Sequence, residues 1–201
     1  AWLAEGYRAY EAAFLAGQLP EMQARFWQPK PAEELYDMAA DPDALVNLAA
    51  DPAHAGTLAE MSAALDAHML AIQDCGLIPE RSPAEAPAQR NDPAVYPLPR
   101  VLDLANQAIR RDPANMPRFL TALADPSPVI RYWGAQGLLI LAAAGQRLPP
   151  AVMLAAEAEA DADVLVALWE AIGRAGDAAT AALYLTALAD RSNTRHIRIK
   201  A

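Results

Sequence analysis

The first residues in the sequence that could do covalent chemistry are the single cysteine, Cys75, and a histidine seven positions before it, His68. A cysteine attacks as its thiolate, so a nucleophilic site needs a base or a positive field beside the sulfur. His68 could lie on the same helical face, but nothing else nearby completes such a site. We expect Cys75 to be a half-buried structural thiol at a helix end. One cysteine allows no internal disulfide, and the redox compartment stays open.

Metal ligation is the second kind of chemistry to consider, and the histidines His54, His68 and His196 are its first candidates. A helical metal site places two ligands three or four residues apart, and no two of these histidines have that spacing. We expect His68 to be a partly buried histidine at the edge of an apolar stripe. The sequence therefore predicts no histidine metal site.

Four aspartates, Asp37, Asp41, Asp43 and Asp51, are close enough in sequence to suggest a Ca²⁺ site. An EF-hand loop needs glycine at its sixth position and a closing glutamate, and the segment around Asp41 has neither. We expect these carboxylates to accept hydrogen bonds in turns and at a helix N-cap.

A second acidic run contains Glu157, Glu159, Asp161 and Asp163. General acid–base catalysis needs two carboxylates that converge on a cleft, whereas this run predicts a solvated helix end. The sequence thus predicts no catalytic, cofactor-binding or metal-binding residue.

Composition and charge narrow the class of protein. The chain has 201 residues, of which 54% are hydrophobic and only 6% aromatic. Strand-favouring runs are scarce, so the fold is expected to be mostly α. A net charge of −9 without a clustered basic patch argues against nucleic-acid binding. The longest apolar run, Gly134 to Gly145, predicts a buried helix because a membrane span needs roughly 20 apolar residues.

Residues 1–18 predict an amphipathic helix, because Leu3, Tyr7, Tyr10 and Phe14 recur at helical spacing. Further along, Glu34–Met38 is the best candidate for a strand. A single strand needs partners that the rest of the chain hardly supplies. We therefore expect those partners to lie outside the chain.

A second helix is predicted from about Pro52 to Gln73. Asp51 is its expected N-cap, because proline follows at the first helical position, and Gly76 is its expected C-terminal stop. One side of this helix carries an apolar stripe formed by Leu58, Met61, Leu65, Met69 and Ile72.

A repeat of thirty-odd residues organises the C-terminal half. Thr121–Asp125 recurs as Thr186–Asp190, and Ala156–Asp161 holds the same place between them. This spacing is typical of helix-pair solenoids. In each unit we expect the first helix to end at an aspartate that caps the second helix. Tryptophan follows that aspartate after eight residues, as an anchor of the repeat core, and glycine after twelve: Trp133, Gly137, Trp169 and Gly173.

Residues Pro29 to Ala49 resemble the C-terminal signature of the sulfatase family. The segment reads PKPAEELYDMAADPDALVNLA, and the family pattern is approximately R/K-P-x-E-E-L-Y-D-L-x-x-D-P-x-E-x-x-N-L-A. Met38 stands where leucine is usual, and Ala44 replaces a common glutamate. The following residues, as far as Glu80, resemble the sulfamidase-like branch, in which some bacterial members carry HEAT-like repeats. The matching residues are Glu34, Leu35, Tyr36, Asp37, Asp41, Pro42, Asn47 and Leu48.

The resemblance implies that this segment ends a small antiparallel sheet, packed with a helix against a large α/β catalytic domain. The partners of the strand would lie upstream of Ala1, which no initiator methionine precedes. Sulfatases hydrolyse sulfate esters or sulfamates with a formylglycine made in C/S-x-P-x-R, beside Ca²⁺. The chain lacks that motif, so formylglycine and Ca²⁺ would belong to the parent enzyme, and this chain alone would be inactive. A periplasmic or secreted location is expected from the resemblance only.

Together these patterns predict a mostly α protein in three parts. These are a sulfatase-like α+β segment (1–80), a proline-rich linker or wrapping arm (81–100) and HEAT-like repeats (101–201) that stop inside a third unit, at Asn193–Ala201. The expected role is to complete the sheet of a missing N-terminal catalytic domain and offer a helical surface for a protein partner or self-association. A stand-alone HEAT-like adaptor is the alternative. An enzyme with its site on the concave face of the solenoid is a third interpretation.

Overall fold

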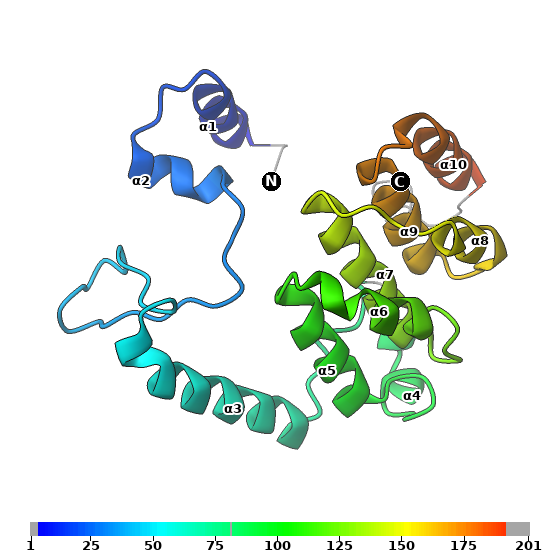
Figure 1. Cartoon of the computed structure of the whole chain (residues 1–201), viewed down its shortest axis with the longest axis horizontal. Coiled ribbons are helices and arrows are strands. Elements are labelled where there is room, and N and C mark those ends of the chain that lie inside the picture. Colours follow the sequence, from blue (N-terminus) through cyan, green and yellow to red (C-terminus); the bar gives the residue numbers. More distant parts are fainter. Residues whose placement is uncertain (1–3, 81, 192–201) are drawn as a thin grey trace. The chain divides into compact units, whose positions relative to one another are not determined.

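A computed structural model describes residues 4–80 and 82–191 (Figure 1). These residues form ten α-helices, four short 3-10 helices and no strand, which confirms the prediction of a mostly α protein. None of the described helices is long and apolar enough to cross a bilayer. The chain divides into two compact units, residues 1–55 and residues 56–201. This boundary lies inside the segment 1–80 that the sequence suggested as one part.

The elements follow in chain order. The first unit contains α1 (Glu5–Leu15), α2 (Glu21–Ala24), η1 (Arg25–Trp27) and η2 (Pro52–His54). α3 (Ala55–Ala71) begins at the boundary between the units. The second unit continues with η3 (Pro83–Glu85), α4 (Pro87–Arg90), α5 (Leu98–Ile109), η4 (Pro113–Asn115), α6 (Met116–Ala122), α7 (Pro128–Ala143), α8 (Ala151–Ala158), α9 (Ala162–Arg174) and α10 (Ala178–Arg191).

An aromatic cluster organises the first unit. α1 presents Tyr7, Tyr10 and Phe14 to Phe26 and Trp27 of η1, with Tyr10 and Trp27 at 5.3 Å and Phe14 and Trp27 at 6.0 Å between ring centroids. The amphipathic helix expected in residues 1–18 is therefore present. No described residue of this unit is buried, however. The described part of this unit therefore has an aromatic cluster but no buried core.

Glu34–Met38 does not form the predicted strand. Leu35 donates its backbone N–H to Oδ1 of Asn47 at 2.9 Å, and its carbonyl accepts from the N–H of Leu48 at 2.7 Å. A side-chain amide thus takes one of the places that a second strand would fill. Because no neighbouring segment of the described chain continues this pairing, the backbone has no ladder, and a strand is defined by its ladder.

α3 begins as the sequence predicts and ends differently. Asp51 accepts a hydrogen bond from the N–H of Ala53 at 2.9 Å and so caps the short η2 turn that leads into α3. At the other end, Gln73 takes the left-handed conformation with φ of 52°, and the N–H of Asp74 donates to the carbonyl of Met69. Gly76, the predicted stop, lies beyond this C-terminal cap.

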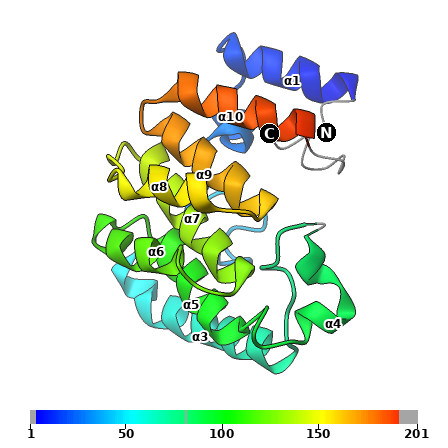
Figure 2. The ribbon, with the colours of Figure 1, turned by 90° about the vertical axis from the view of Figure 1, so that its right-hand side faces the viewer.

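The second unit is built around a row of helices, α5, α7 and α9, in which α7 packs against both neighbours (Figure 2). α6 packs against α7, while α8 and α10 pack against α9. The buried side chains of these helices form one continuous core, whose largest fully buried members are Phe119, Leu138, Leu141 and Leu168. Close packing of this kind gives the unit a core that the first unit lacks.

The segment between α3 and α5 packs on the row of helices and is not a free linker. Ile78 and Tyr96 are buried in the core. Trp133 of α7 donates its Nε1–H to the carbonyl of Leu77 at 2.7 Å, and Ser127 donates its hydroxyl to the carbonyl of Val95 at 2.5 Å. Residues 81–100, expected as an extended linker or a wrapping arm, carry η3 and α4 and bury Ala84 and Tyr96, so this arm is a packed part of the second unit. Prolines shape this arm without competing for helix hydrogen bonds.

The two units that the sequence pattern predicts as repeats differ in how their second helix is capped. Asp161 caps α9 directly, whereas α7 is capped by Ser127, and Asp125 instead accepts the N–H of Ser127. The expectation that Asp125 caps the second helix is therefore wrong, and the capping register is shifted by two residues. Trp169 is buried, at 2% exposure, and stacks on Tyr184, whereas Trp133 is only partly buried. The predicted start of the third unit's second helix, Asn193–Ala201, lies outside the described residues.

Candidate functional site

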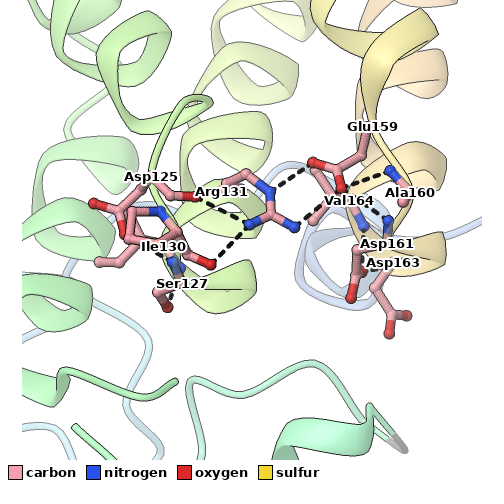
Figure 3. Close-up of polar contacts among 10 residues, drawn as sticks. Asp125, Ser127, Ile130, Arg131, Glu159, Ala160, Asp161, Asp163 and Val164 are labelled. Carbon is pink, nitrogen blue, oxygen red and sulfur yellow. Dashed lines mark hydrogen bonds and ion pairs between the residues drawn. The ribbon is translucent and has the colours of Figure 1, made fainter. Parts of the chain in front are cut away.

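A polar network of the second unit joins the α6–α7 turn to the α8–α9 turn (Figure 3). Arg131 of α7 donates from Nε to Oε2 of Glu159 at 2.7 Å and from Nη2 to Oε1 at 3.1 Å. Its Nη1 donates to the carbonyls of Asp125 and Pro126, both at 3.0 Å. A bidentate guanidinium–carboxylate pair with further carbonyl acceptors is strong and directional.

The carboxylate of Glu159 is also held by its own turn. Oε1 accepts the N–H groups of Ala160 and Asp161, both at 2.8 Å. Oδ1 of Asp161 then accepts the N–H groups of Asp163 and Val164, which start α9. One chain of hydrogen bonds therefore runs from the α6–α7 turn, through Arg131, to the beginning of α9. Glu159 is the central acceptor of this junction.

The pKa values of two carboxyl groups at the junction, those of Glu159 and Asp161, are shifted in opposite directions. Burial is the largest influence on Glu159 and opposes its ionisation. The hydrogen bonds from Arg131 and from the N–H groups of Asp161 and Ala160 together outweigh burial, so the pKa of Glu159 is lowered. Burial also dominates for Asp161, and here the nearby negative charges add to it, so the pKa of Asp161 is raised.

The expected solvated helix end at Glu157, Glu159, Asp161 and Asp163 is therefore wrong for three of its members. The Glu159 side chain is only 7% exposed, and Asp163 is buried. Asp161 lies half-buried as the N-cap of α9. The sequence pattern could not reveal the burial of Glu159, because it does not show that Arg131, 28 residues earlier, lies beside it. The carboxylates of Glu159 and Asp161 already accept fixed hydrogen bonds. The junction is therefore suited to hold helix pairs together and not to transfer protons.

A groove lies beside the junction. It has a volume of about 500 Å³ and is lined mainly by Leu120 and Leu123, near the end of α6, and by Ala151, Ala155 and Ala158 of α8. The three alanines recur every three or four residues, so one face of α8 leaves room opposite the leucines. The Arg131–Glu159 pair also borders this space. A groove of this shape can receive apolar side chains.

The residues singled out in the sequence are mostly structural. Cys75 is half-buried, and its thiol donates to the carbonyl of Gln73 at 3.4 Å. His54 lies 4.0 Å from the Asp51 carboxylate, and His196 lies outside the described residues. His68 is exposed on α3, so the expectation that it is partly buried is wrong. Over residues 4–80 and 82–191, no three histidine, cysteine or acidic side chains come together as a metal site.

Two aspartates of residues 29–49 hold turns, as expected. Asp37 accepts the N–H groups of Ala39 and Ala40, and Asp41 accepts those of Leu45 and Val46. Each carboxylate therefore satisfies backbone donors of its own loop. A polar pocket of the same segment, between residues 25 and 47, was not foreseen. The sequence indicates this pocket only weakly, in that two of the three basic residues in 1–55 lie there.

Comparisons with protein-family models, with curated proteins and with solved structures find no match for this chain.

Proposed function

We propose that this chain serves as the non-catalytic C-terminal region of a sulfatase-like hydrolase, docking on a catalytic domain through residues 1–55. The observation that carries the proposal is that no described residue of this unit is buried. A segment that buries no core cannot offset the entropy lost when it orders. An ordered conformation of the unit therefore calls for a partner surface.

The exposed side chains of the sulfatase-like segment fit such a role. Met38, Leu45 and Val46 are exposed apolar residues at the turn that Asp41 holds. Exposed apolar groups on a fixed loop are typical of a contact surface. The residues that match the family pattern, Asp37, Asp41 and Asn47, are the ones that fix this loop. The resemblance and the exposed apolar loop both support a docking role for the segment.

In this proposal the second unit offers a helical surface, as HEAT-like pairs do, and the Arg131–Glu159 junction keeps two helix pairs in register. The parent enzyme would cleave sulfate esters or sulfamates, and its formylglycine and Ca²⁺ would lie in the catalytic domain. A stand-alone helical adaptor is the second candidate function. The groove between α6 and α8 favours it, because that groove could receive a partner without any catalytic domain.

Sequencing the gene upstream of the codon for Ala1 tests the proposal. We expect an in-frame extension of several hundred codons that encodes C/S-x-P-x-R. A start codon directly upstream of Ala1 would overturn the proposal and leave the adaptor.

A second, independent test is hydrogen exchange on the chain alone. We expect little protection at Leu35 to Met38, because their contact partner is absent. Strong protection there in a monomeric sample would mean that residues 1–55 are stable alone, against the docking role.

A further inference from the structure

One flank of α3 carries a row of exposed apolar side chains. Met61, Leu65 and Ile72 are 57%, 58% and 55% exposed. The N–H of Ile72 donates to the carbonyl of His68 at 3.0 Å, so the helical hydrogen bonding of α3 reaches this last position. Large apolar side chains that gather on one exposed face are typical of a contact surface.

The row is held in place because a different face of α3 attaches the helix to the second unit. Met69 packs on the core of that unit, and Oδ2 of Asp66 accepts a hydrogen bond from Nδ2 of Asn106 in α5 at 2.9 Å. Just after α3, the carbonyl of Asp74 accepts the hydroxyl of Tyr96 at 2.7 Å. The exposed flank thus belongs to a helix that is packed on a buried core, and little conformational freedom is lost when a partner covers it.

The spacing of the row is that of the contact line in a coiled coil. Its members follow one another at intervals of four, three and four residues: Met61, Leu65, His68 and Ile72. Alternation of three and four is the spacing that keeps side chains facing a second helix. The partner that fits such a row is therefore another α-helix.

The charges favour a second copy of this chain as the source of that helix. With a net charge of −9, two copies repel each other over most of their surfaces. The acidic residues of α3 lie off the row, since Asp66 is on the attached face and Glu60 lies about 100° round the helix from Met61. Two copies can meet along this row without bringing like charges together, because the flanking positions are uncharged: Ser62, Ala64, Met69 and Ala71.

An antiparallel pairing matches the row to itself. Met61 then lies opposite Ile72 of the second copy, and Leu65 lies opposite His68, so the contact is isologous. A parallel pairing would place the two copies of His68 together and align the two helix dipoles, and both are unfavourable. One polar residue in such a row also fixes the register of the pair, at a cost in stability.

We propose that α3 pairs with α3 of a second copy of the chain, antiparallel and along the row from Met61 to Ile72. The pairing is reversible, because the row covers only about two heptads and a small contact area is typical of transient association. This inference does not rest on the proposed docking role, which concerns residues 1–55.

Sedimentation equilibrium of the full chain over a range of concentrations tests the pairing. We expect the average mass to rise reversibly from that of a monomer toward that of a dimer. Leu65→Glu should raise the dissociation constant by about a hundredfold or more, because each dimer would bury two charges without partners. Since Leu65 is mostly exposed in the single chain, circular dichroism of this variant should match wild type.

Leu70→Glu is the matched control on the same helix. Leu70 is 40% exposed and lies about 140° round the helix from Leu65, away from the row. This variant gains the same charge and should dimerise like wild type. Leu65→Lys alone should be monomeric, whereas an equal mixture of Leu65→Lys and Leu65→Glu should recover the dimer, because opposite charges then meet between the two copies.

A wild-type chain that stays monomeric at every concentration would overturn the pairing and leave the row to a partner of another kind. Equal dissociation constants for Leu65→Glu and Leu70→Glu would also overturn it, because self-association would then use another surface. Neither result bears on the gene sequence upstream of Ala1, so this proposal and the docking role can fail separately.

Discussion

Gly137 of α7 lies against the ring of Phe119 in α6: a Cβ placed on Gly137 would come within 2.5 Å of Phe119 Cδ1. Gly134, one turn earlier, faces the carbonyl of Phe119 and the Cβ of Ala122 in the same way. Two glycines on one face of α7 thus let α6 approach closely, and Phe119 is buried as a result. The contact between these helices depends on the absence of side chains.

Gly137→Ala is therefore expected to destabilise the chain. Alanine gains helix propensity of about 1 kcal/mol over glycine, but overpacking in a filled core costs about 1–3 kcal/mol. Because Phe119 is enclosed, we expect overpacking to prevail, with a net loss of about 1–2 kcal/mol in the free energy of unfolding. Urea unfolding followed by circular dichroism measures it.

Gly56→Ala provides the matched control, because nothing lies within 4 Å of a Cβ built on Gly56 in α3. This variant should be neutral or slightly more stable. If both variants were stabilised alike, the close approach of Phe119 to Gly137 would be contradicted.

A second prediction concerns Trp133 and the arm. Trp133→Phe removes the donor to the Leu77 carbonyl while keeping an aromatic ring against the core. The cost should be about 1 kcal/mol, typical of one hydrogen bond, and hydrogen exchange should quicken at Leu77 and Ile78 before it does in α9. A full truncation, Trp133→Ala, should cost more, up to about 3–5 kcal/mol.

Tyr184→Phe serves as a control for Trp133→Phe. It removes a hydroxyl from α10 but keeps the stacking of this ring on Trp169, whose centroid is 3.9 Å away. It should leave exchange in the arm unchanged. Exchange at Leu77 that is the same in wild type and Trp133→Phe would mean that the indole does not anchor the arm.

The parts of the fold that could be predicted are those governed by local rules. The helical spacing of Tyr7, Tyr10 and Phe14 predicts α1, and Asp51 followed by proline predicts the start of the next helix. Both depend on residues within a few positions of each other. Local rules failed at the end of α3, where Gln73 takes the left-handed conformation that glycine usually provides.

The rest depended on contacts that sequence spacing does not reveal. The side chain of Asn47 takes the place of a strand partner for Leu35, and Arg131 pairs with Glu159 from 28 positions earlier in the chain. The local sequence pattern around Leu35 or Glu159 could not show either contact. The repeat register failed for a similar reason, because Ser127 competes with Asp125 as the cap of α7. In the candidate site, Glu159, Asp161 and Asp163 could be named from the sequence, but neither Arg131 nor its pairing with Glu159 could be.

A third prediction follows from the depressed pKa of Glu159. Glu159→Gln should lower the stability at pH 7 by about 1.5–3 kcal/mol, as expected for hydrogen bonds to a charged group. In the wild type this stability is present above the ordinary carboxyl value of 4.5 and is lost as pH falls through the lower folded pKa. The two proteins should therefore converge in acid. Urea unfolding between pH 7 and pH 3 measures the difference.

Arg131→Met in the Glu159→Gln background checks the pairing itself. If Arg131 acts mainly through Glu159, the loss in the double variant should be smaller than the sum of the two single losses. A pH-independent difference between wild type and Glu159→Gln would contradict the assignment of an ionised carboxylate at the junction.

The last prediction separates the two roles of Asp161, which caps α9 yet has a raised pKa because of burial and its acidic neighbours. Asp161→Ala removes the cap and should cost about 1 kcal/mol. Asp161→Asn keeps an oxygen that accepts the N–H groups of Asp163 and Val164 but removes the charge. Since ionisation costs more in the folded chain than in the unfolded one, wild-type stability falls as pH rises from the ordinary value of 3.8 through the folded pKa. We therefore expect Asp161→Asn to match or exceed wild type at pH 7 in urea unfolding. A loss in Asp161→Asn as large as that in Asp161→Ala would show that the charge stabilises α9, through the positive end of its dipole, more than burial opposes it.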